Sequence, residues 1–261
     1  MSEENRSDAS ALSPDPPPSV PEEGFSPPPV PPEPENPFVP MPGSIGMGAL
    51  LDTLLKQPGH VICELDGNRR RQVLGMLFGI AGLAFLVYGF LVGWFSGGRQ
   101  LWAAPVKIAV GALCSGLLCL PSLYIFSCLS GIEVRFSYAF GLLTGLLALT
   151  AVLLMGFAPV AWLFSVSTDS IMFMGLLHYG FWGLGTYFGM RFLSKGYERD
   201  VTAASGYLTV WMVVYILVTV QMTTTLRPII GEADTFLPTE KKFFLDHWLT
   251  LDGSMGDRGQ K

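Results

Sequence analysis

Long apolar stretches without charged residues alternate with short polar segments along most of the chain. The first, residues 73–95, is long enough as a helix, at about 1.5 Å per residue, to cross the roughly 30 Å hydrocarbon layer of a membrane. Four more follow, at residues 108–129, 136–158, 170–190 and 203–226. Because backbone polar groups in lipid must be satisfied within the segment, the pattern predicts an all-α integral membrane protein with about five transmembrane helices.

Two details refine the spans. The third stretch stays uncharged up to Thr168, longer than one crossing needs, so Pro159 is expected to end its helix and leave residues 161–164 at the interface. Tryptophans prefer membrane interfaces, and four of them lie close to the predicted span ends: Trp94, Trp102, Trp162 and Trp182.

Residues 1–43 form a different kind of segment. They contain 14 of the 20 prolines, together with eight acidic residues and one basic residue. Proline removes backbone donors and excludes helix, so this arm is predicted to be disordered with extended character. It is interpreted as a spacer that holds the amino terminus off the membrane, with the alternative of a proline-domain ligand through the PxxP at Pro28 to Pro31.

Two short amphipathic segments flank the spans. In the juxtamembrane segment, residues 44–72, leucines at positions 50, 51, 54 and 55 have helical spacing before Pro58 and Gly59 stop the helix. This helix, preceded by prolines, resembles the WH2 actin-binding helix, although LLKQ replaces its LKKT-like signature; a membrane-surface or packing role is the alternative. In the tail, residues 227–261, a second interfacial helix is predicted over 236–251.

Charge placement gives the orientation. Basic residues favour the cytoplasmic side, and the cluster Arg69 to Arg71 directly precedes the first span. The prediction is therefore amino terminus inside and carboxyl terminus outside. Because residues 1–13 lack the features of a cleaved signal peptide, the first span is expected to act as the insertion signal. This fits a bacterial inner membrane, with a eukaryotic endomembrane as the alternative.

Composition supports this interpretation. Half of the 261 residues are apolar and 14% are charged, well below the roughly one quarter usual in soluble chains. The net charge of -5 comes from the arm, and no basic stripe indicates nucleic-acid binding. The four cysteines have no CxxC pair or nearby histidine, so they are interpreted as small buried hydrophobes, and neither cofactor nor metal is expected.

Two places carry candidate polar chemistry. The outer end of the fifth span has a dense polar set, predicted to be a functional patch or simply threonines bonded to their own helix: Gln221, Thr223, Thr224, Thr225 and Arg227. His178, near the middle of the fourth span, is the intramembrane ionisable group, with no carboxylate in any span to relay a proton.

An enzyme is not expected. Ser115 and His178 could form an intramembrane protease dyad, but the serine lacks the GxSG of rhomboid-like proteases, and no other common catalytic motif is present. Small residues four apart instead predict close helix packing, within the chain or in a homo-oligomer: Gly75 and Gly79, Gly89 and Gly93, Gly141 and Gly145, Gly185 and Gly189.

The order of proline-rich arm, amphipathic element and five closely spaced helices resembles the Yip1 family of small membrane proteins. Residues 101–105, LWAAP, are similar to the acidic-leucine-aromatic-glycine-proline start of that family's second span, with Gln100 replacing the acidic residue and Ala104 the glycine. The resemblance covers residues 45–226 in outline and implies a non-enzymatic protein that organises membranes or binds partner proteins.

The sequence thus favours a non-catalytic membrane scaffold or adaptor, which meets the lipid bilayer and protein partners through the arm and the interfacial helices. One alternative is a transporter or channel subunit that uses the polar end of the fifth span. A further alternative is actin or proline-domain binding through the amino-terminal arm.

Overall fold

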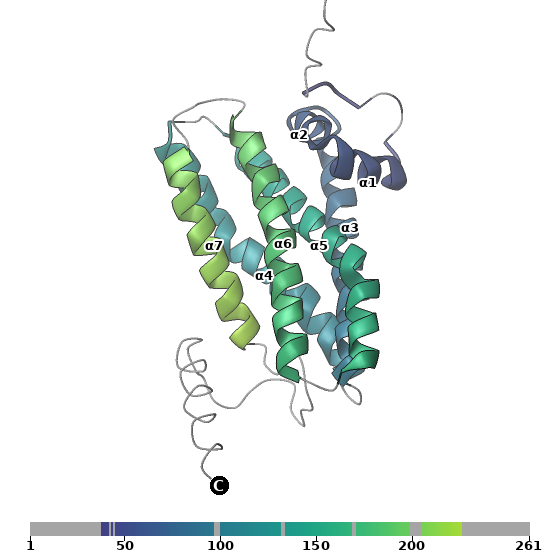
Figure 1. The fold of residues 1–261 in the computed structure, drawn as a ribbon. Coiled ribbons are helices and arrows are strands. Elements are labelled where there is room, and N and C mark those ends of the chain that lie inside the picture. The colour runs from purple at the N-terminus through teal and green to yellow at the C-terminus, as the bar shows by residue number, and fades with distance from the viewer. Residues whose placement is uncertain are drawn as a thin grey trace, which may run out of the picture. The chain divides into compact units, whose positions relative to one another are not determined.

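The computed structural model describes residues 38–41, 43, 45–96, 100–131, 134–168, 171–198 and 205–225. These residues form seven helices and contain no strand: α1 (Met47–Lys56), α2 (Pro58–Asp66), α3 (Arg70–Ser96), α4 (Gln100–Leu129), α5 (Phe136–Ser167), α6 (Ile171–Glu198) and α7 (Ser205–Thr225) (Figure 1). The predicted all-α class is confirmed. Disorder was predicted for residues 1–43; of these, residues 1–37, 42 and the tail helix predicted over 236–251 lie outside the described residues, while Met41 is buried and hydrogen-bonded.

Four helices in the described part are long and apolar enough to cross a membrane, at Arg70–Trp94, Leu101–Leu129, Phe136–Ser167 and Gly206–Thr223. The chain is therefore a multi-pass membrane protein. The predicted span 170–190 does form a helix, α6, and its 28 residues are sufficient in length. It is not one of the four because its composition is less apolar, with five glycines, two tyrosines and His178 between residues 172 and 190.

Helix α5 lies at the centre of the packing. All residues from Gly141 to Val152 are buried, with α3 and α6 as its main neighbours and α4 in lesser contact. Helix α6 runs antiparallel to α5, since Phe173 contacts Phe164 near one end and Gly196 meets Leu142 near the other. A helix that is apolar all round needs such burial or lipid on every side.

The prediction that Pro159 ends a helix at residue 158 was wrong, because α5 continues to Ser167. A proline inside a helix removes one backbone hydrogen bond, and packing can offset that loss. Here Phe157 stacks on Phe181 at 4.8 Å before the proline, and Phe164 contacts Phe173 after it. Ring contacts on both sides of Pro159 thus hold α5 against α6.

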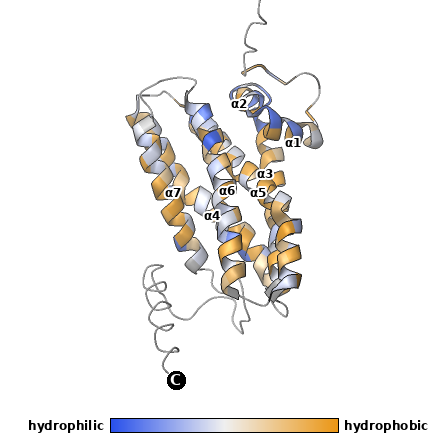
Figure 2. Cartoon of the chain, viewed as in Figure 1, coloured by the Kyte–Doolittle hydropathy of each residue, from blue (hydrophilic) through white to orange (hydrophobic). Residues whose placement is uncertain are grey.

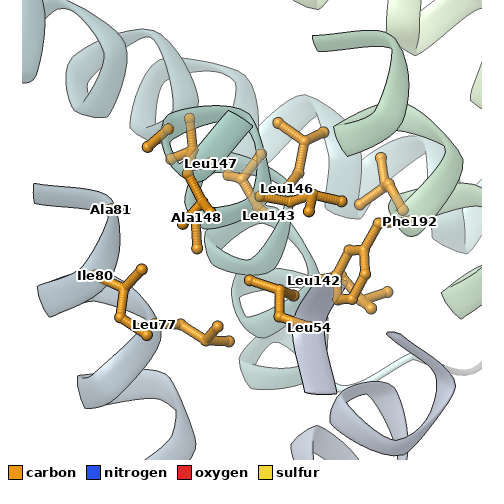
Figure 3. Close-up of a cluster of buried hydrophobic side chains, with 14 of the residues drawn as sticks. Leu54, Leu77, Ile80, Ala81, Leu142, Leu143, Leu146, Leu147, Ala148 and Phe192 are labelled. Atoms are coloured by element: carbon orange, nitrogen blue, oxygen red, sulfur yellow. The ribbon is translucent and has the colours of Figure 1, made fainter. Parts of the chain in front are cut away.

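Helices α1 and α2, together called the cap, cross one end of the long helices (Figure 1). Residues 58 and 59 were expected only to stop a helix, yet Pro58 begins α2, a role suited to proline because the first helical N–H has no intrahelical acceptor. Figure 3 shows Leu54 in one cluster of buried side chains with Leu77, Leu142 and Phe192. The apolar face of the amphipathic segment therefore has the packing role.

The cap lies at the end of the bundle where α3 and α5 begin and α4 and α6 end, here called the cap end. At this end the Tyr138 hydroxyl donates to the Gly196 carbonyl at 3.0 Å, and the Ser127 hydroxyl donates to the Tyr197 oxygen at 2.8 Å. Figure 2 shows hydrophilic residues in the cap and in the adjacent end of α6, with apolar residues along α3 and α5. These two hydrogen bonds join α4 and α5 to α6 at the cap end.

Helix α7 is attached mainly to α4 and touches α6 only slightly. The Trp211 indole N–H donates to the Cys119 carbonyl at 3.1 Å, and the ring stacks on Tyr215 at 5.5 Å. Both aromatic side chains are fully buried, whereas only 17% of the Gly206–Thr223 segment is buried overall. The buried side chains of α7 are thus few, and Trp211 bonds directly to α4.

We expect Leu54→Ala to destabilise the protein far more than Leu55→Ala. Leu54 is 1% exposed in the core and Leu55 is 48% exposed on the same helix. Removing a buried leucine side chain costs about 2–5 kcal/mol, which should lower the thermal midpoint in mild detergent by several degrees. Equal midpoints for the two variants would contradict the packing of α1 against the bundle.

Candidate functional site

Three polar side chains hold the chain where it enters the cap. The Glu64 carboxylate accepts the Met41 N–H at 3.0 Å, the Arg69 guanidinium donates to the Gly43 carbonyl at 2.7 Å, and the Gln72 amide donates to the Ile45 carbonyl at 3.3 Å. We call Glu64, Arg69 and Gln72 the clamp. They come from α2, the α2–α3 connection and the first turn of α3, so both the cap and the bundle hold the incoming segment.

The clamp combines a buried carboxylate, Glu64, with two exposed side chains, Arg69 and Gln72. Glu64 is 6% exposed, and Met41 and Ile45 belong to the buried apolar cluster. A hydrogen bond to a charged acceptor contributes about 1.5–3 kcal/mol, and it also satisfies a carboxylate that would otherwise be costly to bury. Gly43 has a φ of 81°, the left-handed conformation that glycine adopts readily, where Arg69 reaches its carbonyl.

This geometry bears on the predicted binding of actin. Leu50 and Leu54 form the apolar face of α1, and both are buried in the bundle. An amphipathic helix that docks in a partner's groove uses that same face. Helix α1 would have to leave the core to bind actin in this way.

A second polar feature lies between the long helices. The Tyr88 hydroxyl and the His178 Nδ1 are 2.6 Å apart, joining α3 to α6, and the two residues are 2% and 9% exposed. His178 is the eighth residue of α6, roughly 10 Å along the axis from its start, and so lies off the middle of the helix. The pair fixes α3 relative to α6 by a specific bond in addition to apolar packing.

The suggested dyad of Ser115 and His178 is not formed. The Ser115 hydroxyl donates to the Gly111 carbonyl of its own helix at 2.7 Å, while His178 is paired with Tyr88. Among the described residues, no cluster of three or more His, Cys, Asp and Glu side chains could hold a metal ion.

A buried cation lies elsewhere in the bundle: Lys107, in the second turn of α4, is 2% exposed.

The predicted polar patch is only partly within the described region. Gln221 and Thr223 are half-buried on α7, and the Thr223 hydroxyl donates to the Val220 carbonyl at 2.7 Å. The backbone of Thr224 and Thr225 continues the helix, while their side chains and Arg227 lie outside the description. In the described part, threonine bonding to the same helix accounts for Thr223.

The predicted glycine pairs fall into two groups. A Cβ at Gly89 would lie 2.5 Å from the Pro105 Cα, and a Cβ at Gly145 would lie 2.3 Å from the Phe192 ring, so both glycines allow close packing. Close approaches to neighbouring elements also occur at Gly141, Gly185 and Gly189. Gly93 is buried. By contrast, a Cβ at Gly75 or Gly79 would meet no described atom within 4 Å, so these two glycines make no close contact with the part of the chain that the structure describes.

Sequence patterns did not single out Glu64, Gln72 or Tyr88. Glu64 does follow Val61 at helical spacing on the apolar face of α2, and a carboxylate in such a position is the signal that could have revealed a buried acceptor. Tyr88 offers no comparable signal, because tyrosine is ordinary in spanning helices.

Comparison with protein-family models, curated proteins and solved structures finds no match. The resemblance to the Yip1 family therefore stays a prediction, and function must be argued from the geometry of this chain.

We expect Tyr88→Phe to destabilise the bundle, whereas Tyr179→Phe, at a position 49% exposed, should have little effect. Removing the Tyr88 hydroxyl leaves the His178 nitrogen buried without its partner, a loss of about 1–2 kcal/mol. Thermal unfolding in mild detergent measures both variants. In a double variant with His178→Leu, the combined loss should be smaller than the sum of the single losses; strict additivity would show that the two residues do not interact.

Proposed function

We propose that the protein is a non-catalytic membrane scaffold or adaptor that holds its proline-rich arm at a fixed point beside the membrane. The observation that carries this proposal is the clamp. Glu64, Arg69 and Gln72 bond the backbone of residues 41, 43 and 45, where the arm ends, so the arm would be attached to the bundle through three hydrogen bonds and the buried Met41 and Ile45.

The charge and composition of the arm support this role. Proline-rich segments act as extended spacers or as ligands for proline-recognition domains, and the arm combines both features with eight acidic residues. A free spacer needs no buried attachment. A segment that presents a ligand benefits from one, because a fixed origin limits the volume the ligand searches and raises its effective concentration at the membrane.

We further infer that α6 is a fifth span. Its contacts extend along nearly the whole of α5, from Phe164 and Phe173 at one end, through Thr150 and Gly185, to Gly196 at the other. A helix bound along the full length of a membrane-spanning partner crosses the same layer. Apolar side chains on its outer face, including Met172 and Leu176 at 64% and 65% exposure, suit contact with lipid.

Five crossings put the two termini on opposite sides. The exposed cations near the cap end include Arg71, Arg135 and Lys195. By the positive-inside tendency, these cations favour a cytoplasmic position for this end and for the arm. A bacterial inner membrane fits this arrangement.

Partner capture tests the scaffold role. The full chain and a variant lacking residues 1–36 would be purified in mild detergent, and copurifying proteins identified by mass spectrometry. This deletion leaves Met41 and the clamp in place, whereas a longer one that removed α1 would expose the core. We expect defined partners that are lost on deletion.

The variant Pro28→Ala/Pro31→Ala in the full chain separates two uses of the arm. Loss of the same partners would indicate recognition of the PxxP segment, and their retention would indicate another part of the arm. Partners that are unchanged when residues 1–36 are removed would contradict the proposed role of the arm.

The crossing by α6 is tested by single cysteines introduced at Asn68, Thr168 and Gly206, with the four native cysteines replaced. A membrane-impermeant maleimide applied to intact cells should label Thr168→Cys and leave the other two unlabelled. Gly206 offers open space for the new side chain and Asn68 is exposed. If positions 168 and 206 are labelled alike, α6 does not cross.

A further inference from the structure

The outer face of α6 carries a row of three side chains near the cap end: Tyr187, Arg191 and Lys195. Positions four apart on a helix lie on one face, with Cβ atoms about 5–6 Å apart. Tyr187 is 55% exposed, and both cations are exposed. The row therefore places two positive charges and a phenol within reach of a single ligand.

The row points away from the protein. Gly185 and Gly189 on the same helix meet Thr150 and Leu146 of α5. Tyr187 is two residues from either glycine, a rotation of about 200° around the helix axis, so the row faces the side opposite to α5. What it meets is the medium around the bundle.

Neither Arg191 nor Lys195 forms an ion pair or hydrogen bond with any other side chain in the described part of the chain. The ion pair found there joins Asp52 to Lys56, on α1. An arginine on a lipid-facing helix surface is costly without an anion, and lysine and arginine near a helix end reach toward the headgroups. The described side chains supply no counter-charge to the row, and an anionic headgroup at this position would supply one.

The neighbouring residues indicate the depth of the row relative to the hydrocarbon and the headgroups of the membrane. Leu184 and Phe188, 44% and 42% exposed, extend the apolar surface toward the other end of α6. Tyrosine prefers the interface between hydrocarbon and headgroups, and here Tyr187 stands directly before the two cations. Along a few turns the surface changes from apolar to aromatic to cationic. These residue types suit, in the same order, the hydrocarbon, the interface and the anionic headgroups of a phospholipid leaflet.

We propose that Arg191 and Lys195 bind the phosphate of an anionic phospholipid in the leaflet at the cap end, with the Tyr187 hydroxyl at the same headgroup. The guanidinium presents two parallel N–H donors to phosphate oxygens, and the ammonium adds a second charge one turn away. The acyl chains lie along Leu184 and Phe188. This site rests on the proposed crossing of the membrane by α6, and it is independent of the arm.

Binding is measured on the purified full chain in mild detergent, by native mass spectrometry with added phosphatidylglycerol or phosphatidylcholine. The test variant is Arg191→Gln/Lys195→Gln. The matched control is Arg70→Gln/Arg71→Gln, which removes the same charge from the start of α3 at the same end. Each cation near an anionic headgroup contributes about fivefold in affinity, so the test variant should bind phosphatidylglycerol roughly 25-fold more weakly.

The control should lose no more than a few-fold, and phosphatidylcholine should bind weakly to all three proteins. Equal losses in the two variants would show diffuse charge attraction and overturn the site. Inorganic phosphate is the second probe: if it displaces phosphatidylglycerol at low millimolar concentration, the row binds a soluble anion and the lipid proposal is wrong.

Thermal unfolding in phosphatidylcholine checks that the test variant is folded, as expected for two exposed side chains. The result of the lipid-binding test can be distinguished from the results of the tests of the other proposals. Cysteine labelling at positions 168 and 206 tests the crossing by α6, and deletion of residues 1–36 tests the arm, so failure of lipid binding leaves both results standing.

Discussion

Burial of the central part of α5, from Gly141 to Ala151, on every side is the constraint on which the remaining helices depend. Each other helix in the described part contacts α5 directly or through one neighbour. Its central residues are glycine, alanine, leucine and threonine, and the small ones admit large partners, as where Gly145 faces the Phe192 ring. In lipid, helices gain little from apolar burial as such, so close packing and cross-helix bonds determine their positions. The Thr150 hydroxyl, which donates to the Gly185 carbonyl at 3.2 Å, is one such bond.

Specific polar contacts then fix the relative positions of helices that apolar packing alone leaves undetermined. The Tyr88–His178 pair joins α3 to α6, which make few backbone contacts with each other, and the Tyr138–Gly196 bond joins α5 to α6 at the cap end. The clamp does the same for the segment before α1. Each of these bonds links elements far apart in sequence, so together they define one arrangement among the many that apolar surfaces alone permit.

Much of this architecture follows from the sequence because a long apolar run has few options in a membrane. The helices over the apolar stretches, and the inward face of α1 with Leu50 and Leu54, are predicted by period and length. The helix α2 and the continuation through Pro159 are not, since local signals treat both prolines as breaks and only tertiary contacts decide otherwise. The partner of His178 is equally hidden, because pairing across helices depends on register, which hydropathy does not encode.

The sequence predicted a helix over 170–190, and in the resulting α6 composition and packing point in different directions. Glycines lower its apolar character, yet Gly185, Gly189 and Gly196 are the residues that let it approach α5. A sequence profile counts them against a spanning helix, while the structure uses them to form one of the closest helix contacts in the described part.

The docking of α7 on α4 has a consequence for biosynthesis. Trp211 and Cys119, joined by a hydrogen bond, are 92 residues apart in sequence. At ribosomal rates of about 5–20 residues per second, that interval lasts roughly 5–20 s. During it, the surface of α4 that will receive the indole is already synthesised but has no partner from its own chain. Until α7 emerges, this surface of α4 faces the membrane without its indole, so the packing of the described helices is complete only once the α7 segment has been synthesised.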